Sequence, residues 1–473
     1  MKKITLIGAG SLIFSTTLMN DMLATPCLQD SEFVLMSPTA WKIEKAAKWA
    51  NSVVERNNLR ATVTATTDRR EALKDADFVL AMFQIGGMEA YKYDYEIPMK
   101  YGVDQCLGQC VGPGGVFRGA RSIAAFQDIL RDMEELCPGA VLLNYVNPMA
   151  ICSIGIGRST SIPFVGLCHG VQTTLDLIAG YTDCHKSEID FLCAGINHMA
   201  WFLKLEKEGQ DLYPLFKANC EKPEYYINDK VRIETMRHFG YFMTESTGHL
   251  SEYLAYFRKN QKCLDLYCDQ PAFGGETGAY YKYCSFIADK FAEGNFSRFK
   301  NNELLPRSKD YGSSVIEALV TGNPFTLNGN VMNDGKYIRN LPEDCCVEVP
   351  IFVDKSGIHP VNIGNLPTQL AGLNMMNINV QLMAAEAALE GDPEKLMMAC
   401  AMDPLTGAVL SLQEIRDMAM EMLEAERQWL PQFATRAMYK LGDIATTTET
   451  KGVDVPLDPA LAVANQFGKL AND

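Results

Sequence analysis

Hydrophobic runs alternate with amphipathic stretches along the first 140 residues of the chain. Short β-rich runs lie at residues 3–6, 32–36, 62–66 and 77–83, and apolar residues recur at helical spacing over residues 12–24 and 42–56. Alternating strand and helix units of this length predict a parallel sheet with helices on both of its faces.

Three further hydrophobic runs, between residues 142 and 198, end in polar side chains. The pairs that follow them are Asn144 and Asn147, Cys168 and His169, and Asn197 and His198. If the runs are neighbouring strands of one parallel sheet, their carboxyl ends share an edge, and open α/β sheets bind ligands along that edge. We therefore expect a thiol, an imidazole and two amides to meet a small molecule there.

The turn between the first strand and the first helix reads Gly8-Ala9-Gly10-Ser11. Glycine lets the backbone approach a pyrophosphate closely, and the helix N-terminus attracts its charge. The third glycine of the dinucleotide fingerprint is replaced by Ile13, so the turn alone fits a plain strand-to-helix connection equally well. Ser37 stands where an acidic residue usually holds the adenosine ribose, and no arginine beside it suggests a 2′-phosphate, which favours NAD over NADP. The predicted cofactor-binding residues are Gly8, Gly10, Ser11, Ser37 and Asn144.

A glycine-rich segment at residues 112–118, GPGGVFR, predicts a loop that leads into a helix over residues 118–135. Arg118 could face an anion or sugar hydroxyls there, or it could be a solvated surface arginine.

Beyond Trp201 the strand and helix alternation stops. Two β-rich runs at residues 325–331 and 346–353 flank a turn signal at residues 333–335, and helices are predicted over residues 367–390 and 412–429. The last forty or so residues have little apolar periodicity and are expected to form an arm or a partly disordered tail. We predict an α/β protein with a Rossmann-like NAD-binding domain over residues 1–195. A mixed α+β domain over residues 196–473 is predicted to bind substrate and metal and to form the oligomer interface.

Composition narrows the class of protein. The 473 residues are 47% hydrophobic and 21% charged, as in soluble globular proteins, and no long apolar run or signal peptide stands out, so we expect a cytoplasmic protein. The fifteen cysteines are scattered singly, and most should be reduced and buried. A net charge of −15 without a basic stripe disfavours nucleic acid and anionic membranes as partners.

Cys168 and His198 are the first candidates for a metal site. They stand after different hydrophobic runs, which suits the ends of two strands better than one helix face. A thiolate and an imidazole, completed by water and substrate hydroxyls, would bind a divalent transition ion with open positions. A lone cysteine and a lone histidine are also common in protein cores.

A series of motifs in this chain resembles glycoside hydrolase family 4, and its α-galactosidase branch most closely. The motifs are GAGS at 8–11, DADFVLAMFQIGG at 75–87, GPGGVFR at 112–118, LLNYVNPMA at 142–150, GLCHGV at 166–171, CAGINHMAWF at 193–202, GYFMTES at 240–246, GNVMNDG at 329–335, NLPEDCCVEVP at 340–350 and MDPLTGAVL at 402–410. The resemblance implies a fold like that of lactate and malate dehydrogenases. It also implies a homodimer or homotetramer.

The resemblance further implies hydrolysis of a small α-glycoside without the usual pair of carboxylates. In this family NAD oxidises the sugar at C3, a divalent metal, typically manganese, polarises the ketone, and a base removes the C2 proton. The glycosidic oxygen is then eliminated, water adds, and the hydride returns.

Residue roles carry over from the family by position. Cys168 and His198 match the metal ligands, and Asn147 matches a substrate-binding asparagine, to which we add Arg118 from its loop. His169 stands where the phospho-glucosidase branch of the family has its leaving-group acid. For the C2 base we favour Tyr253, with Tyr256 and Tyr311 as alternatives.

Gly170 departs from the α-galactosidase pattern, in which a serine follows the histidine. Glycine is more typical of the α-glucuronidase branch, and it could open room for a substituent at C6 or change recognition at C4. The alternatives are thus an α-glucuronidase or α-glucosidase of the same family. From other classes, an NAD-dependent hydroxy-acid dehydrogenase and a non-catalytic NAD-binding protein also fit the cofactor turn.

Overall fold

The computed structural model describes residues 1–292, 303–442, 444–453, 463 and 467. By internal contacts the chain divides into two units, Met1–Ala437 and Met438–Asp473. The first unit contains the first predicted domain and residues 196–437 of the second, and the boundary between residues 195 and 196 stays a prediction.

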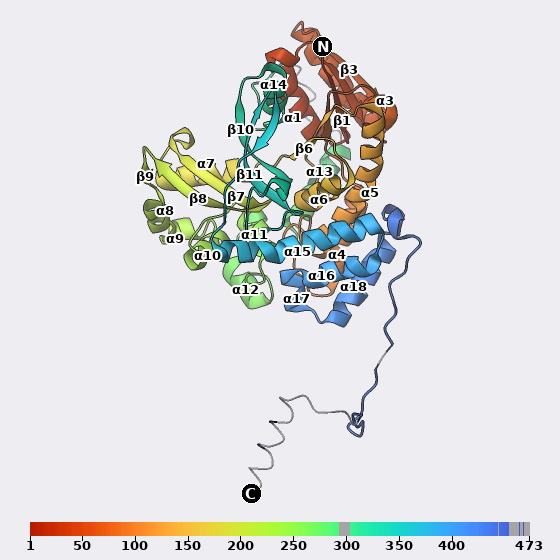
Figure 1. The fold of residues 1–473 in the computed structure, drawn as a ribbon, viewed down its shortest axis with the longest axis vertical. Helices are drawn as coiled ribbons and strands as arrows, with labels where there is room; N and C mark the ends of the chain where they lie inside the picture. Colours follow the sequence, from red (N-terminus) through yellow and green to blue (C-terminus); the bar gives the residue numbers. More distant parts are fainter. Residues whose placement is uncertain (293–302, 443, 454–462, 464–466, 468–473) are drawn as a thin grey trace. The chain divides into compact units, whose positions relative to one another are not determined.

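One sheet organises the first unit (Figure 1), and within the described residues it has twelve strands. Their order is β3-β2-β1-β4-β5-β6-β10-β11-β7-β8-β9, and β12 pairs with β11. The strands are β1 Lys3–Ile7, β2 Glu32–Met36, β3 Thr62–Thr66, β4 Phe78–Ala81, β5 Val141–Asn144, β6 Phe164–Gly166, β7 Asp190–Ile196, β8 Met199–Lys207, β9 Gln210–Asp211, β10 Phe325–Met332, β11 Cys346–Asp354 and β12 Gly357–Pro360.

The strands β1 to β6 are parallel and follow the order 3-2-1-4-5-6. This is the order of a dinucleotide-binding Rossmann sheet, in which the strand order reverses beside β1. The predicted Rossmann-like fold of the amino-terminal part is confirmed.

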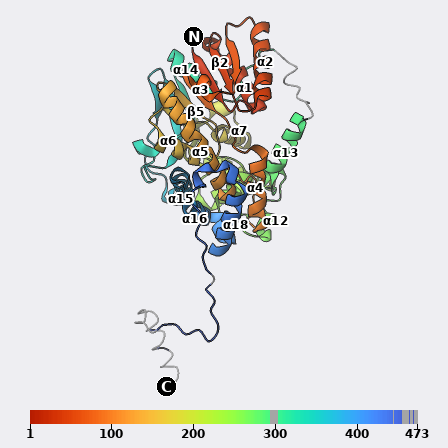
Figure 2. The ribbon, with the colours of Figure 1, turned by 90° about the vertical axis from the view of Figure 1, so that its right-hand side faces the viewer.

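Helices cover both faces of this parallel part. The helices before β7 are α1 Leu12–Leu23, α2 Ala40–Arg56, α3 Arg69–Leu73, α4 Gly87–Lys100, α5 Gly112–Leu136, α6 Met149–Ser159 and α7 Gly170–Thr182. In β4, Phe78 and Leu80 belong to the core that includes α1 and α2, whereas Val79 and Ala81 belong to the core that includes α5 and α6. Alternate side chains of a strand face opposite sides, so both faces are apolar and both are covered. Figure 2 shows α1 and α2 on one side of the amino-terminal strands and α5 and α6 on the other.

The remainder of the first unit mixes helices with strands, as predicted, and its strands pair antiparallel. Its helices are α8 Tyr213–Cys220, α9 Pro223–Tyr226, α10 Lys230–Phe239, α11 Thr247–Tyr253, α12 Gln261–Tyr267, α13 Ala279–Ala292, α14 Gly312–Thr321, α15 Thr368–Glu390, α16 Pro393–Met402, α17 Pro404–Val409 and α18 Leu412–Ala425. The long helix α15 packs against α5, α6 and α16 (Figure 1).

Residues 112–118, predicted as a loop, are instead the first turns of α5. Pro113 is tolerated there because the first N–H groups of a helix have no partner within it. Gly114 and Gly115 serve packing: a Cβ would lie 2.5 Å from the carbonyl oxygen of Gly108 in the first case and 2.6 Å from the carbonyl carbon of Cys110 in the second. The loop prediction was therefore wrong because these glycines allow close backbone approach within a helix.

The third hydrophobic run, β7, is not a neighbour of β5 and β6. Strands β10 and β11 lie between β6 and β7, and each pairs antiparallel with its neighbours. The prediction of three adjacent parallel strands is correct for β5 and β6 and wrong for β7.

One row of paired residues nevertheless crosses from β6 to β7. Gly166 pairs with Asn330, Asn330 with Glu348, and Glu348 with Gly195. A Cβ on Gly166 would lie 2.9 Å from Asn330 Cβ, and one on Gly195 would lie 2.6 Å from the carbonyl oxygen of Met199, so glycine permits close packing at both ends of the row. The segments that follow Gly166 and Gly195 therefore start from the same level of the sheet.

The cysteines follow the expectation from composition. All fifteen cysteines carry free thiols, and most are buried. None of the helices in the described ranges is long and apolar enough to cross a membrane.

In the second unit, residues 439–442 and 444–453 are exposed and form neither helix nor strand, while most of the remaining predicted tail lies outside the described residues.

Candidate active site

Cys168, His198 and Glu245 bring three potential metal donors together. Cys168 follows β6, His198 lies in the two-residue turn between β7 and β8, and Glu245 precedes α11. Cys168 Sγ lies 3.4 Å from His198 Nε2 and 3.5 Å from Glu245 Oε1, and His198 Nε2 lies 3.4 Å from Glu245 Oε1. Donors arranged tetrahedrally at about 2.0–2.3 Å from one ion are separated by roughly these distances.

The pKa values of His198 and Cys168 also bear on whether these side chains could bind a cation. Burial lowers the pKa of His198 to about 3, so its imidazole is neutral and has a lone pair to give. Burial, together with the nearby Glu245 and Glu348, raises the pKa of Cys168 well above its ordinary value of 9.0. A bound cation would favour the thiolate. The three side chains therefore fit a divalent transition ion.

His198 is held in an uncommon backbone conformation. Its φ is +64°, in the left-handed region that residues with a Cβ rarely adopt. The hairpin of β7 and β8 fixes this turn through the pairing of Ile196 with Met199. Strained residues of this kind concentrate at functional sites, and here the strain presents the imidazole to Cys168.

Gly170 makes room for the carboxylate of Glu245. It is the first residue of α7, and a Cβ at this position would overlap Glu245 Oε1. The space left by the missing serine side chain is therefore filled by Glu245, and it does not form an open pocket.

His169 follows Cys168, one of the three potential metal donors, and its side chain pairs with Asp310. Its Nε2 lies 2.7 Å from Asp310 Oδ1, and this hydrogen bond raises the pKa of His169 above its ordinary value of 6.5. The next residue, Tyr311, contacts the Cys168 peptide: its hydroxyl accepts from the Cys168 N–H at 3.0 Å and donates to the Cys168 carbonyl oxygen. Residues 310 and 311 thus hold both members of the Cys168-His169 pair.

The three candidate tyrosines have different surroundings. Tyr253 is 2% exposed, and its ring centroid lies 6.3 Å from that of His198. Tyr256 is 45% exposed and stacks on Phe239. The Tyr311 hydroxyl is already engaged with the backbone of Cys168.

The predicted cofactor turn is tied to the end of β2. Gly8 has a φ of +91°, and the N–H groups of Gly8 and Ala9 both donate to the carbonyl oxygen of Met36. A Cβ on Gly10 would lie 2.8 Å from the Oγ of the buried Ser37, so the turn and Ser37 are in close contact. Ser11 is exposed at the N-terminus of α1.

Asn144, the remaining predicted cofactor residue, is buried at the end of β5. Its Oδ1 accepts from the Val146 N–H at 2.9 Å, and its Nδ2 lies 3.4 Å from Met149 Sδ. The side-chain amide is thus engaged within the turn that follows β5.

Arg118 and Asn147, the predicted substrate residues, are in contact. Arg118 Nε donates to the carbonyl oxygen of Asn147 at 3.2 Å, and the guanidinium lies over the ring of Tyr91. Arg118 is 7% exposed, and its buried Nη1 has no hydrogen-bond partner within the described chain. A buried, unpartnered cationic nitrogen is costly unless a ligand completes it, so it suits a sugar hydroxyl or an anion.

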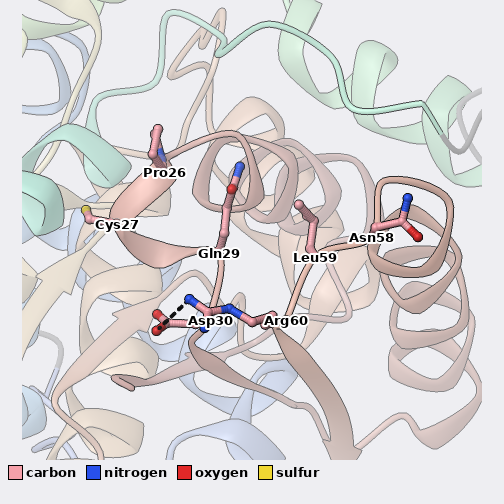
Figure 3. A pocket seen from close by; sticks show the side chains of 7 residues that line it. All are labelled: Pro26, Cys27, Gln29, Asp30, Asn58, Leu59 and Arg60. Carbon is pink, nitrogen blue, oxygen red and sulfur yellow. Dashed lines mark ion pairs between the residues drawn. The ribbon is translucent and has the colours of Figure 1, made fainter.

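A surface hollow of about 340 Å³ lies elsewhere (Figure 3). Its lining residues are Pro26, Cys27, Gln29, Asp30, Asn58, Leu59 and Arg60. They precede β2 and β3, whereas Cys168 and the cofactor turn follow the carboxyl ends of β6 and β1. This hollow is therefore not part of the site described above.

Comparison with known proteins identifies the family. A model described as "Family 4 glycosyl hydrolase" matches residues 3–183, and one described as "Family 4 glycosyl hydrolase C-terminal domain" matches residues 193–406. The chain belongs to glycosyl hydrolase family 4. It is therefore a glycoside hydrolase and not a hydroxy-acid dehydrogenase.

Relatives and solved structures agree with the family 4 assignment. The chain is 39% identical over 91% of its length to an α-galactosidase of Rhizobium meliloti, covering 90% of that protein. It is 40% identical over 92% of its length to an α-galactosidase of Bacillus subtilis, covering all of that protein. The fold is similar to that of a 6-phospho-α-glucosidase from gut microorganisms, solved in complex with NAD and Mn²⁺, with a TM-score of 0.75, 20% identity and coverage of 91% of this chain and 99% of that one.

Sequence reasoning gave no role to three polar residues of this candidate site, Glu245, His249 and Asp310, although His249 is one of three histidines that follow apolar runs. Glu245 and His249 stand on either side of Ser246, whose hydroxyl caps α11, and the motif GYFMTES ends there. That motif and the cap were the available signals. Asp310 had none, because it meets His169 only through the fold.

Proposed function

We propose that this family 4 enzyme is an α-galactosidase that requires NAD and a divalent cation, with Mn²⁺ as the expected ion. The observation that carries the proposal is 39–40% identity to two α-galactosidases over more than 90% of the chain. The need for NAD is supported by the Rossmann strand order and by the glycine turn beside Ser37. The need for a cation is supported by the donor distances at Cys168.

Bound NAD would supply reversible oxidation of the sugar at C3, and a bound cation would supply the polarisation of the C3 carbonyl that makes the C2 hydrogen acidic. Cys168, His198 and Glu245 would hold the cation. The backbone of Gly8 and Gly10 would receive the pyrophosphate, with Ser11 at the helix N-terminus.

The chain's own residues would then move two protons. His169, whose pKa is raised by its hydrogen bond to Asp310, would donate a proton to the departing glycosidic oxygen. The Tyr253 hydroxyl accepts the C2 proton. Burial raises the pKa of Tyr253 well above its ordinary value of 10.0, so it can act as a base only beside a positive charge, which a cation near His198 would provide. Arg118 and Asn147 would orient the sugar.

An α-glucuronidase is less well supported. The space beside Gly170, which could have received a C6 substituent, contains the Glu245 carboxylate. A uronate placed against Glu245 would meet a charge of the same sign. We therefore expect a neutral glycone.

The substrate is tested by comparing hydrolysis of p-nitrophenyl α-galactoside, α-glucoside and α-glucuronide in the presence of NAD and Mn²⁺. We expect the galactoside to have the highest kcat/KM. A clear preference for the glucoside or the glucuronide would overturn the α-galactosidase proposal and assign that activity to the enzyme instead.

A further inference from the structure

A second group of metal donors adjoins the first. Cys110, His198 and His249 each offer one ligand atom, and the three atoms lie within 4.8 Å of one another. Cys110 stands two residues before α5, His198 lies in the β7–β8 turn, and His249 is on α11. Cys110 is 5% exposed and His198 is 4% exposed, while His249 is half-buried.

The two imidazoles are held in place. The ring centroids of His198 and His249 are 4.6 Å apart. His249 Nδ1 lies 3.1 Å from Ser246 Oγ and 3.6 Å from Glu245 Oε2, contacts that orient the ring as outer partners of a metal-binding histidine do. His198 Nε2 faces Cys168 and Glu245, whereas its buried Nδ1 has no partner in the part of the chain that the structure describes. That unpartnered nitrogen marks a place for a ligand.

The two groups differ in donor chemistry. The group at Cys168 contains a carboxylate, and oxygen donors suit manganese. The group at Cys110 offers one sulfur and two nitrogens and no oxygen, which suits zinc and similar ions. We propose that Cys110, His198 and His249 form a second cation position, selective for Zn²⁺-like ions, beside the position at Cys168.

The shared histidine couples the two positions. A neutral imidazole has one lone pair, so His198 can bind only one ion at a time, whichever ring nitrogen it uses. Binding at the second position releases the thiol proton of Cys110 to solvent and removes His198 from the first position. Zinc should therefore displace manganese. That this inhibits hydrolysis rests on the function proposed above.

The first test follows displacement of Mn²⁺ by Zn²⁺, with free Mn²⁺ measured by electron paramagnetic resonance. The variants are Cys110→Ser and His249→Ala, and the control is Cys400→Ser, a buried cysteine of α16 outside both groups. Wild type and control should release Mn²⁺ at the same Zn²⁺ concentration, and both variants should need about tenfold more or higher, since loss of a metal partner typically costs at least that. Equal release from all four proteins would overturn the proposal.

The second test uses Co²⁺ alone with metal-stripped Cys168→Ser protein, from which the first thiol is absent. We expect a thiolate-to-cobalt charge-transfer absorption that disappears when Cys110→Ser is added. No such band in Cys168→Ser protein, or a band that persists in the double variant, would contradict the proposal. Neither test measures hydrolysis, so both remain informative if the α-galactosidase proposal fails.

Discussion

At the scale of single residues, the candidate metal site depends on small side chains as much as on the proposed ligands. The proximity of Cys168 and His198 could be predicted because each follows a hydrophobic run within a characteristic motif. Glu245 was not assigned a role although it lies in the motif GYFMTES, because it is 77 positions from Cys168 and meets it only in the fold. The Glu245 carboxylate can approach Cys168 only because Gly170 has no Cβ.

Replacing Gly170 with serine should weaken metal binding. The new side chain would occupy the place of Glu245 Oε1 and push the carboxylate away from Cys168 and His198. We expect Mn²⁺ affinity, measured by calorimetry, to fall about tenfold or more. Gly180→Ser is the matched control, since Gly180 is exposed on the same helix with nothing within 4 Å of an added Cβ. Equal affinities in the two variants would show that Glu245 is not a ligand.

Asp310→Asn should move the alkaline limb of kcat to lower pH. His169 must be protonated to donate, and Asp310 raises its pKa, so activity is lost as pH rises through that pKa. Without the carboxylate the loss should begin at lower pH for substrates with an alkyl leaving group. p-Nitrophenyl α-galactoside serves as the internal control, because nitrophenolate departs without an acid. A pH profile unchanged for both substrates would argue against His169 as the acid.

At the scale of elements, the strands themselves were easier to predict than their order in the sheet. The β-rich runs at residues 32–36 and 62–66 are the observed β2 and β3. The position of β7 could not be read locally, because β10 and β11 come from more than 120 residues downstream. The start of α5 was missed because glycines that allow helix packing resemble glycines of a loop.

Helix α11 carries a buried carboxylate that links stability to pH. Glu252 accepts from the N–H groups of Leu107 and Gly108, and burial raises its pKa to about 7 from 4.5. The folded protein therefore holds this proton more tightly than the unfolded chain. The contribution of Glu252 to stability is fully present below pH 4.5 and is lost as pH rises towards 7.

Glu252→Gln should flatten this dependence, because the amide can still accept from the backbone and does not ionise. Thermal unfolding at pH 5 to 8 should show the wild-type midpoint falling more than that of the variant. Parallel curves for the two proteins would contradict the role given to Glu252.

At the scale of the whole first unit, a buried charge cluster ties sequence-distant segments together. Arg121 of α5 donates to Asp94 of α4 at 2.6 and 2.9 Å and also contacts Glu426, which follows α18. Arg121 is 1% exposed, and both carboxylates are fully buried. The sequence gives no local signal for this contact, since Arg121 and Glu426 are 305 positions apart.

Arg121→Met should destabilise the protein by about 3–5 kcal/mol, because it leaves two buried carboxylates without their cation. The matched control is Arg131→Met on the same helix, whose pair with Asp128 is exposed and should be worth less than about 1 kcal/mol. Urea unfolding followed by circular dichroism measures both. Similar midpoints for the two variants would show that the buried cluster is not a major support.

The central claim is that hydrolysis needs both NAD and a cation held at Cys168 and His198. Its most direct test is hydrolysis of p-nitrophenyl α-galactoside by protein stripped of metal and NAD, with NAD and Mn²⁺ added back singly and together. We predict activity only when both are present, and none in Cys168→Ser protein under the same conditions. Full activity of the stripped protein, or full recovery with either addition alone, would contradict the claim.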